Sequence, residues 1–156
     1  MKLLALSLGL LTGCGLSGGQ SLERNKTLVR RTHTEVWSRG DLKAADEIYA
    51  PDFVAHWTGG PDTKGLEAFK AFVTDGRRRG PDLQETVEQI VAEGDLVVTR
   101  FLSRGTFDSE PGEPTKRKQV TMREFAIHRI RDGKIVEQWT AGGILDIRPI
   151  PDPPAP

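Results

Sequence analysis

The chain has 156 residues, with 22 Lys and Arg side chains against 22 Asp and Glu side chains. This balance argues against a nucleic acid as the main partner, because proteins that bind nucleic acids carry basic patches. The single cysteine excludes an internal disulfide and any metal site built from several cysteines. A chain of this length is expected to form one domain around a single hydrophobic core.

The first residues have the pattern of a secretory signal. A basic residue precedes an apolar run over 3–11, which is too short to span a bilayer. The run leads into Leu-Thr-Gly-Cys, which resembles the bacterial lipobox and implies lipid attachment at Cys14. We therefore expect a signal peptide at 1–13 and a lipidated, flexible, Gly- and Ser-rich tether at 14–24. The protein would be exported across the inner membrane and lipid-anchored in the cell envelope.

Two helices follow with almost no linker. Asn25 can cap the first, whose apolar residues recur at helical spacing until Gly40 ends it. Asp41 can cap a second, short helix that Pro51 stops. A third, amphipathic helix is expected over 65–76.

A short strand at 53–57 precedes the third helix, and four longer strands follow it. The four are expected at residues 83–92, 96–107, 119–131 and 134–141. Helices followed by strands predict an α+β domain over 25–148, a cone in which N-terminal helices pack on a curved, mainly antiparallel sheet. The tail at 149–156 holds five prolines, so it is expected to be disordered and outside the sheet.

Asp132-Gly133 marks a tight hairpin between the last two strands. A two-residue loop sets Ile127 opposite Gln138, whereas a three-residue loop with a glycine bulge sets Ala126 there, and the sequence does not decide between them. The strands are long and carry Arg123 and Gln138 among apolar neighbours. This pattern indicates that one face lines a cavity containing polar groups.

Several stretches together carry a family resemblance from about residue 25 to residue 140. They are Asp41-Leu42, Phe53-Val54-Ala55-His56, residues 65–73, Glu93-Gly94-Asp95, Arg104-Gly105-Thr106 and residues 129–139. In this order they resemble the SnoaL-like polyketide cyclases, which share the nuclear transport factor 2 fold. The resemblance implies a conical domain around an apolar pocket, often dimeric, that works without a metal or an organic cofactor.

The last strand departs from the family pattern. The cyclases carry His-Trp-Asp there, and the aspartate moves a proton during ring closure of a polyketide ester; this chain reads Gln138-Trp139-Thr140. Neither an amide nor a threonine hydroxyl can take a proton next to a carbonyl. We expect Gln138 and Thr140 to hold a ligand oxygen by hydrogen bonds instead.

His56 is the candidate base, because it ends the first strand where a pocket mouth is expected and its ordinary pKa is about 6.5. A packing role fits a histidine at a strand end equally well. Trp57 is expected to form a pocket wall. His33 is expected on a helix surface and His128 is expected to face solvent, and their spacing predicts no metal site.

Arg100 has the same parity along its strand as three apolar residues, so it is expected on an apolar face with a partner. That partner is a carboxylate, with Glu88 and Glu124 as candidates, or an acidic ligand. Arg123 on the neighbouring strand could join it.

Two hypotheses for function follow. In the first, the protein is an enzyme that abstracts a proton next to a carbonyl of a small apolar, keto or acidic molecule. His56 is then the base, Arg100 or Arg123 stabilises the oxyanion, and Gln138 and Thr140 orient the substrate.

In the second hypothesis, the protein is a ligand-binding or interaction lipoprotein of the envelope without catalysis. The missing aspartate and the export signal favour it. In either case Trp139 and Ile135, on an exposed sheet face, would form the contact of a homodimer.

Overall fold

The computed structural model describes residues 16–108 and 117–149. The helices are α1 (Leu16–Arg31), the π-helical segment η1 (Thr32–Trp37), α2 (Leu42–Ile48) and α3 (Leu66–Arg79). The strands are β1 (Tyr49–Trp57), β2 (Thr63–Lys64), β3 (Gln84–Glu93), β4 (Leu96–Asp108), β5 (Arg117–Arg131) and β6 (Lys134–Pro149). The predicted signal peptide, Cys14 and residues 150–156 lie outside the described residues. In the two described ranges, no helix is both long and apolar enough to cross a membrane.

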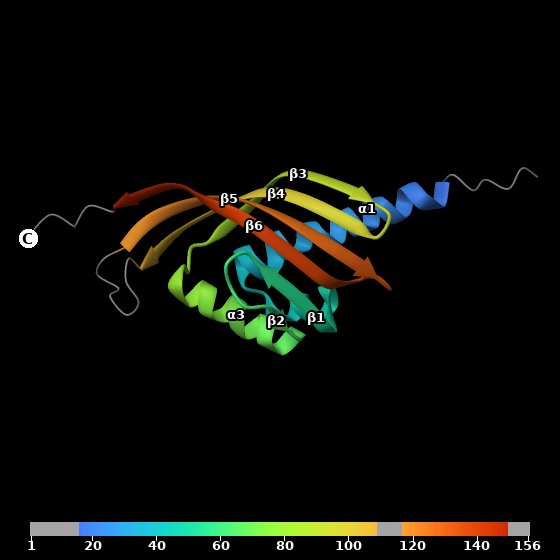
Figure 1. Cartoon of the computed structure of the whole chain (residues 1–156), viewed down its shortest axis with the longest axis horizontal. Coiled ribbons are helices and arrows are strands. Elements are labelled where there is room, and N and C mark those ends of the chain that lie inside the picture. The colour runs from blue at the N-terminus through green and yellow to red at the C-terminus, as the bar shows by residue number, and fades with distance from the viewer. Residues whose placement is uncertain (1–15, 109–116, 150–156) are drawn as a thin grey trace, which may run out of the picture.

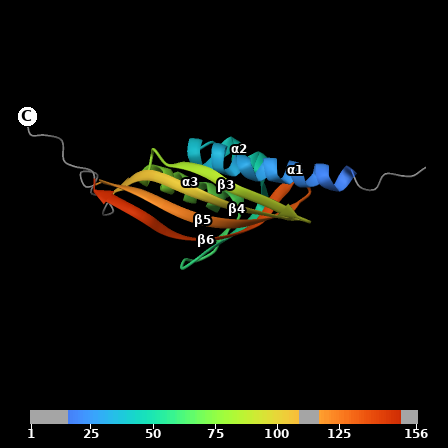
Figure 2. The ribbon, with the colours of Figure 1, turned by 90° about the horizontal axis from the view of Figure 1, so that it is seen from above.

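The strands form one sheet in the order β2-β1-β6-β5-β4-β3. Only β1 and β6 pair in parallel, and all other neighbours are antiparallel. The sheet arches over the helices, with α3 beneath it (Figure 1) and α1 running beside the edge strand β3 (Figure 2). This is the predicted α+β cone, with its helices on the inner face of a curved sheet.

The core fills the space between the helices and one end of the sheet. Val29 of α1 and Val36 of η1 are fully buried, as the helical spacing of apolar residues predicts. Tyr49, Phe53 and Phe69 pack with ring centroids 4.6–5.0 Å apart and are fully buried as well.

Phe53 also brings the backbone of β1 against the loop before α3, since its carbonyl oxygen accepts a 2.7 Å hydrogen bond from the backbone N–H of Gly65.

Helix α1 begins at Leu16, so residues 16–24, which we expected in the flexible tether, are helical. Asn25 is therefore inside the helix rather than at its cap. The reason is packing: α1 lies along β3, and Ser21 and Leu22 are already half-buried. The predicted end is confirmed, because Gly40 takes a positive φ of 71° and the Asp41 carboxylate then caps α2.

The predicted hairpin between β5 and β6 is present, and of the two loop lengths left open it has the two-residue loop at Asp132-Gly133, with positive φ at both residues. A β-bulge follows at once, because the pairing shifts by one residue and leaves Val136 without a partner across the strand. Gln138 consequently faces His128, and both partners predicted for it are wrong.

Strand β6 is longer than predicted and ends at Pro149, which pairs with Lys118. The prediction that the sheet stops before this proline is wrong. Proline has no backbone N–H, but the last position of a strand can pair without donating a hydrogen bond. Ile135 is fully buried, so its predicted place on an exposed sheet face is also wrong. It follows the hairpin directly, on the core side of the bulge.

Candidate functional site

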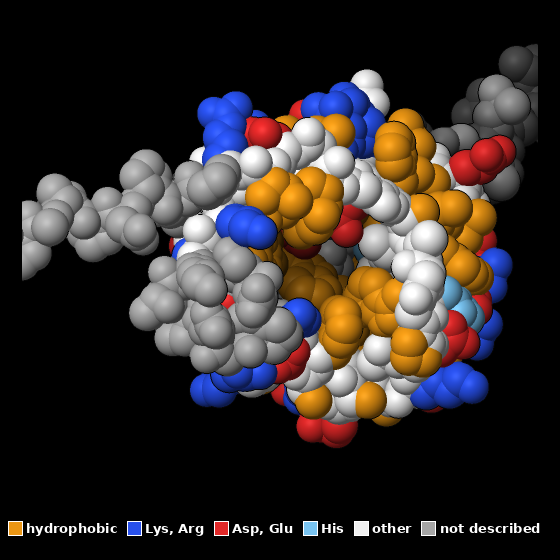
Figure 3. Space-filling view, turned by 60° about the vertical axis from the view of Figure 1, so that its left-hand side comes forward, with side chains coloured by type: hydrophobic (Ala, Val, Ile, Leu, Met, Phe, Trp, Pro, Cys, Tyr) orange, Lys and Arg blue, Asp and Glu red, His pale blue; other side chains and the backbone are white. Residues whose placement is uncertain are grey.

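A cavity of about 220 Å³ lies between the inner face of the sheet and the helices. Its walls are mainly aromatic and apolar and include Trp37, Trp57, Phe72, Phe101, Phe107 and Met122. Polar side chains also line it, among them His33, Glu85, Ser103, Glu124, His128 and Gln138. Figure 3 shows a deep hollow in the surface that is edged mainly by hydrophobic side chains. Such a cavity fits a small, largely apolar molecule with one or two polar groups.

His33 is placed by the π-helical segment η1. The backbone oxygen of His33 accepts hydrogen bonds from the backbone N–H and the hydroxyl of Ser38, the latter at 2.7 Å. The same hydroxyl oxygen accepts a 2.9 Å hydrogen bond from the backbone N–H of Glu85, which ties the helix to β3. π-Helical turns of this kind are frequent at functional sites.

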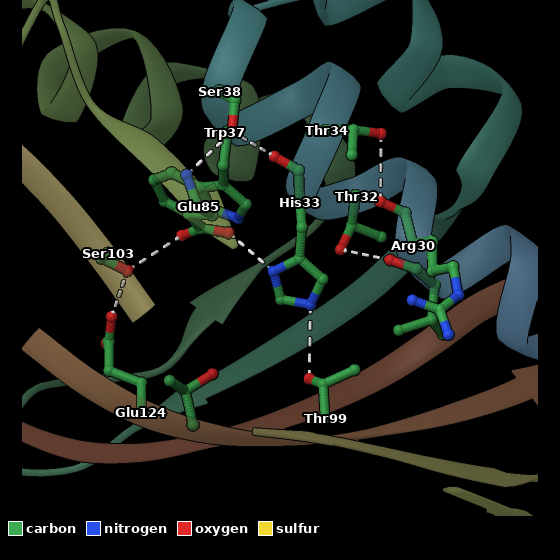
Figure 4. A network of polar contacts seen from close by, with 12 residues as sticks. Arg30, Thr32, His33, Thr34, Trp37, Ser38, Glu85, Thr99, Ser103 and Glu124 are labelled. Carbon is green, nitrogen blue, oxygen red and sulfur yellow. Dashed lines mark hydrogen bonds and ion pairs between the residues drawn. The ribbon is translucent and has the colours of Figure 1, made fainter. Parts of the chain in front are cut away.

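The His33 imidazole contacts two strands (Figure 4). Its Nδ1 lies 2.7 Å from Oε2 of Glu85, and its Nε2 lies 3.3 Å from the hydroxyl of Thr99. The side chains of His33 and Glu85 are only 3% and 7% exposed. Burial lowers the pKa of His33 to about 4 and raises the pKa of Glu85 well above its ordinary value. The expectation that His33 lies on a helix surface is wrong, because this helix rests directly on the sheet.

Ser103 on β4 links two carboxyl groups. Its hydroxyl donates to Oε2 of Glu124 at 2.7 Å and lies 3.5 Å from Oε1 of Glu85. Burial also raises the pKa of Glu124, and the hydrogen bond from Ser103 opposes this shift. The cavity therefore holds two carboxyl groups that ionise less readily than exposed ones.

His128 and Gln138 face each other across β5 and β6 and are almost completely buried. Burial lowers the pKa of His128 to about 3, so its imidazole is neutral at neutral pH. The Gln138 amide donates to the hydroxyl oxygen of Thr140 at 2.8 Å. The expectation that His128 faces solvent is wrong, because it points to the same side of β5 as the buried Ala126 and Ile130.

The sequence matches the model of a known family over most of the chain. Residues 27–146 match the model of the SnoaL-like polyketide cyclases. The chain belongs to this family. No curated protein sequence matches it significantly.

Solved structures agree with this assignment. A SnoaL-like protein from Jannaschia sp. CCS1 matches with a TM-score of 0.70 and 24% identity, over 78% of this chain and 86% of its own. The candidate cyclase IdmH from Streptomyces antibioticus matches with a TM-score of 0.66 and 32% identity, over 76% of this chain and 91% of its own. A candidate cyclase from Acidithiobacillus ferrooxidans has a TM-score of 0.68 at 26% identity, over 76% and 87%.

Three of the residues selected from the sequence line the cavity of this SnoaL-like domain: Trp57, Gln138 and Thr140. The Trp57 indole N–H donates to the hydroxyl of Thr63 at 2.9 Å, and its ring stacks on Phe72. Thr140 is the residue that the family resemblance sets in place of the cyclases' aspartate. Its hydroxyl oxygen accepts from Gln138, so its own hydrogen is available to a ligand.

His56 is not among the residues that line the cavity. It points to the outer face of the sheet, where its ring stacks on Trp139 at 5.4 Å. Its Nε2 lies 3.0 Å from Glu137 and its Nδ1 lies 2.9 Å from Asp62. These carboxylates, first Glu137 and then Asp62, raise the pKa of His56. Both ring nitrogens are thus engaged with carboxylates, away from the cavity.

Arg100 and Arg123 also lie on the outer face. Both pair with the Glu88 carboxylate, at 3.2 and 3.4 Å, and Arg100 donates to the side-chain oxygen of Gln89. Of the two carboxylates considered for Arg100, Glu88 is its partner and Glu124 faces the cavity instead. The structure therefore separates these arginines from Gln138 and Thr140 by the thickness of the sheet.

Sequence reasoning missed Glu85, Ser103 and Glu124 as cavity residues. A usable signal was present on β5, where Glu124 and His128 alternate with exposed residues and share the parity of Ala126. In the described part of the chain, no three His, Cys, Asp or Glu side chains are arranged to hold a metal ion.

Proposed function

We propose that the protein is an enzyme that removes a proton next to a carbonyl in a small, largely apolar molecule, with Glu124 as the base. The observation that supports this most directly is a carboxyl group in an apolar cavity, bonded to Ser103 at 2.7 Å. Burial raises the pKa of this carboxyl, and a carboxylate with a raised pKa is a stronger base than an exposed one.

Glu124 has an oxygen to spare for the substrate. Ser103 donates to Oε2. The other oxygen, Oε1, makes no hydrogen bond with a described residue and is not completely buried. The carboxyl is thereby held in one orientation by one oxygen while the other faces the cavity. Such fixed positioning is what a base needs to reach a carbon-bound proton.

The negative charge that develops on the carbonyl oxygen needs a hydrogen-bond donor. Thr140 can supply it, since its oxygen is occupied by the Gln138 amide and its hydrogen is free. Gln138 then positions Thr140, and the aromatic walls exclude water from the reacting atoms. In this proposal the base lies on β5, whereas the family's aspartate lies on the last strand.

Exchange of carbon-bound hydrogen tests the proposal without knowledge of the natural substrate. Cyclohexanone is incubated in D₂O with the protein, and loss of its α-hydrogens is followed by ¹H NMR. Glu124→Gln should lower the protein-dependent rate by about 10²–10⁴-fold. Glu67→Gln, on the exposed surface of α3, should leave the rate unchanged.

Equal rates in the wild type and Glu124→Gln would reject Glu124 as the base. Binding of cyclohexanone without any exchange would favour the non-catalytic, ligand-binding alternative, which uses the same cavity.

A further inference from the structure

The hydrogen bonds around Ser103 have a direction. A hydroxyl has one hydrogen, and the contact to Glu124 at 2.7 Å is much shorter than the contact to Glu85 at 3.5 Å. When its hydrogen is directed to Glu124, the nearer carboxyl, Ser103 turns lone pairs toward Oε1 of Glu85. An ionised Glu85 would place a second set of lone pairs there, so the contact is favourable only when Oε1 carries a hydrogen.

The other side of Glu85 is consistent with this arrangement. In the tautomer of His33 with the hydrogen on Nδ1, Oε2 accepts from Nδ1–H at 2.7 Å and Nε2 accepts from the Thr99 hydroxyl at 3.3 Å. Figure 4 shows the row of contacts that runs from Thr99 through His33, Glu85 and Ser103 to Glu124. Each contact in this row joins a donor to an acceptor when Glu85 is a neutral acid and Glu124 is ionised. The two carboxyl groups are thus one acid and one base, separated by a single hydroxyl.

We propose that the cavity eliminates water from β-hydroxy ketones, with Glu124 as the base and Glu85 as the acid that protonates the leaving hydroxyl. This inference rests on the proposed function, because Glu124 must first take the proton from the carbon between the two oxygen-bearing carbons. The contact of Glu85 with Ser103 is at the limit of a hydrogen bond, so a substrate hydroxyl competes for this proton at little cost.

The step is balanced without a further reactant. Glu124 takes the α-proton, the electron pair of that C–H bond forms the carbon–carbon double bond, and the C–O bond to the hydroxyl breaks. The departing oxygen takes the proton of Glu85 and leaves as water. Glu124 is then protonated and Glu85 ionised, and Ser103 can restore both by accepting from Glu124 and donating to Glu85.

The test compares 3-hydroxycyclohexanone with cyclohexanone. Elimination from the first gives cyclohex-2-enone, which is followed by its ultraviolet absorbance, while α-hydrogen exchange of the second reports the base alone. The wild type should catalyse both reactions, and Glu124→Gln should lose both. Glu85→Gln should lower the ratio of elimination to exchange by about 10²–10⁴-fold. Circular dichroism of each variant establishes that it is folded.

The outcomes separate the two proposals. Exchange of both ketones without enone formation would overturn the elimination while leaving the proposed function intact. Enone formation with an unchanged ratio in Glu85→Gln would overturn the role of Glu85 as the acid. Absence of both reactions would contradict the proposed function and this inference together.

Discussion

Gly142 faces Glu124 across β5 and β6, and a β-carbon on Gly142 would lie 2.5 Å from Cγ of Glu124. The same atom would lie 2.7 Å from the backbone oxygen of Arg123. No side chain fits there while Glu124 keeps its place. Because glycine has no side chain, position 142 leaves room for the Glu124 side chain, which extends to Ser103.

Gly142→Ala should displace the Glu124 carboxyl from Ser103. We expect a loss of about 1–3 kcal/mol in the free energy of unfolding, because the added methyl overpacks the strand pair. We also expect slower cyclohexanone exchange. Urea denaturation and ¹H NMR measure the two effects. Gly143→Ala is the matched control, since a β-carbon there meets nothing within 4 Å. Similar losses in both variants would contradict this account of Gly142.

Acid should destabilise the fold through His128. Its pKa is about 3 in the folded protein and about 6.5 in an unfolded chain, so the unfolded state binds more protons between these values. The stability that the neutral imidazole retains above pH 6.5 is therefore lost as the pH falls. Relative to His128→Gln, the wild type should lose about 2 kcal/mol between pH 7 and pH 5. Urea denaturation at each pH measures this difference, and parallel pH curves would show that His128 does not titrate as described.

Arg77 joins α3 to the end of the first helical segment. Its guanidinium donates to four backbone carbonyl oxygens, at residues 37, 38, 81 and 83, over 2.7–3.0 Å. Arg77→Met should lower the free energy of unfolding by about 2–4 kcal/mol, since these carbonyls lose their donor. Among the described residues, the neighbouring Arg78 pairs only with Asp75, at the surface, so Arg78→Met should cost less than about 1 kcal/mol. Thermal and urea unfolding measure both variants. Equally small losses in the free energy of unfolding would refute the role of Arg77.

The order of the elements could be predicted from the sequence because helical spacing, caps and turn residues are local signals. Gly40, Asp41 and Asp132-Gly133 all act as expected. The faces of β4 could not be assigned in this way. Its outer face carries Leu96, Val98 and Leu102 around Arg100, and its inner face carries Val97 and Phe101, so both faces are apolar and parity does not say which is buried.

The polar network was missed for a related reason. The bulge at Val136 determines which residue pairs with Gln138. Valine at that position does not indicate a bulge. His33 approaches Glu85 only through the packing of a π-helical segment on a strand 52 residues further along the chain. Contacts of this kind depend on tertiary structure, whereas the choice of Gln138 and Thr140 needed only the strand pattern, which places them on one face, and the family resemblance at this strand.

The outer face of the sheet is a candidate contact for a homodimer, which we propose as the state of the protein. Phe125 and Ile127 are 50% and 39% exposed there, beside Trp139, and Val91 on β3 is 62% exposed. Ile127→Asp should convert the dimer to a monomer in analytical ultracentrifugation, because a charge would be buried in the contact. Ile144→Asp is the control, since Ile144 is exposed elsewhere on β6. A monomeric wild type would contradict the proposal.

We also propose the envelope anchor that the Leu-Thr-Gly-Cys pattern predicts. Cys14→Ser removes the sulfur that would carry the lipid, so the protein should move from the membrane fraction to the soluble fraction when expressed in a bacterial host. Ser7→Ala, within the apolar run, should leave the distribution unchanged. Membrane retention of Cys14→Ser would refute lipidation.

Carbon-detected NMR titration of the glutamate carboxyl groups tests the acid–base pair most directly, without any substrate. Spectra of the wild type, Glu85→Gln and Glu124→Gln assign the two signals. We predict that both carboxyls titrate above the ordinary glutamate range, and that Glu85 is still protonated at a pH where Glu124 is ionised. If both were ionised together in the ordinary range, the cavity would hold no acid paired with a base, and the central claim would be wrong.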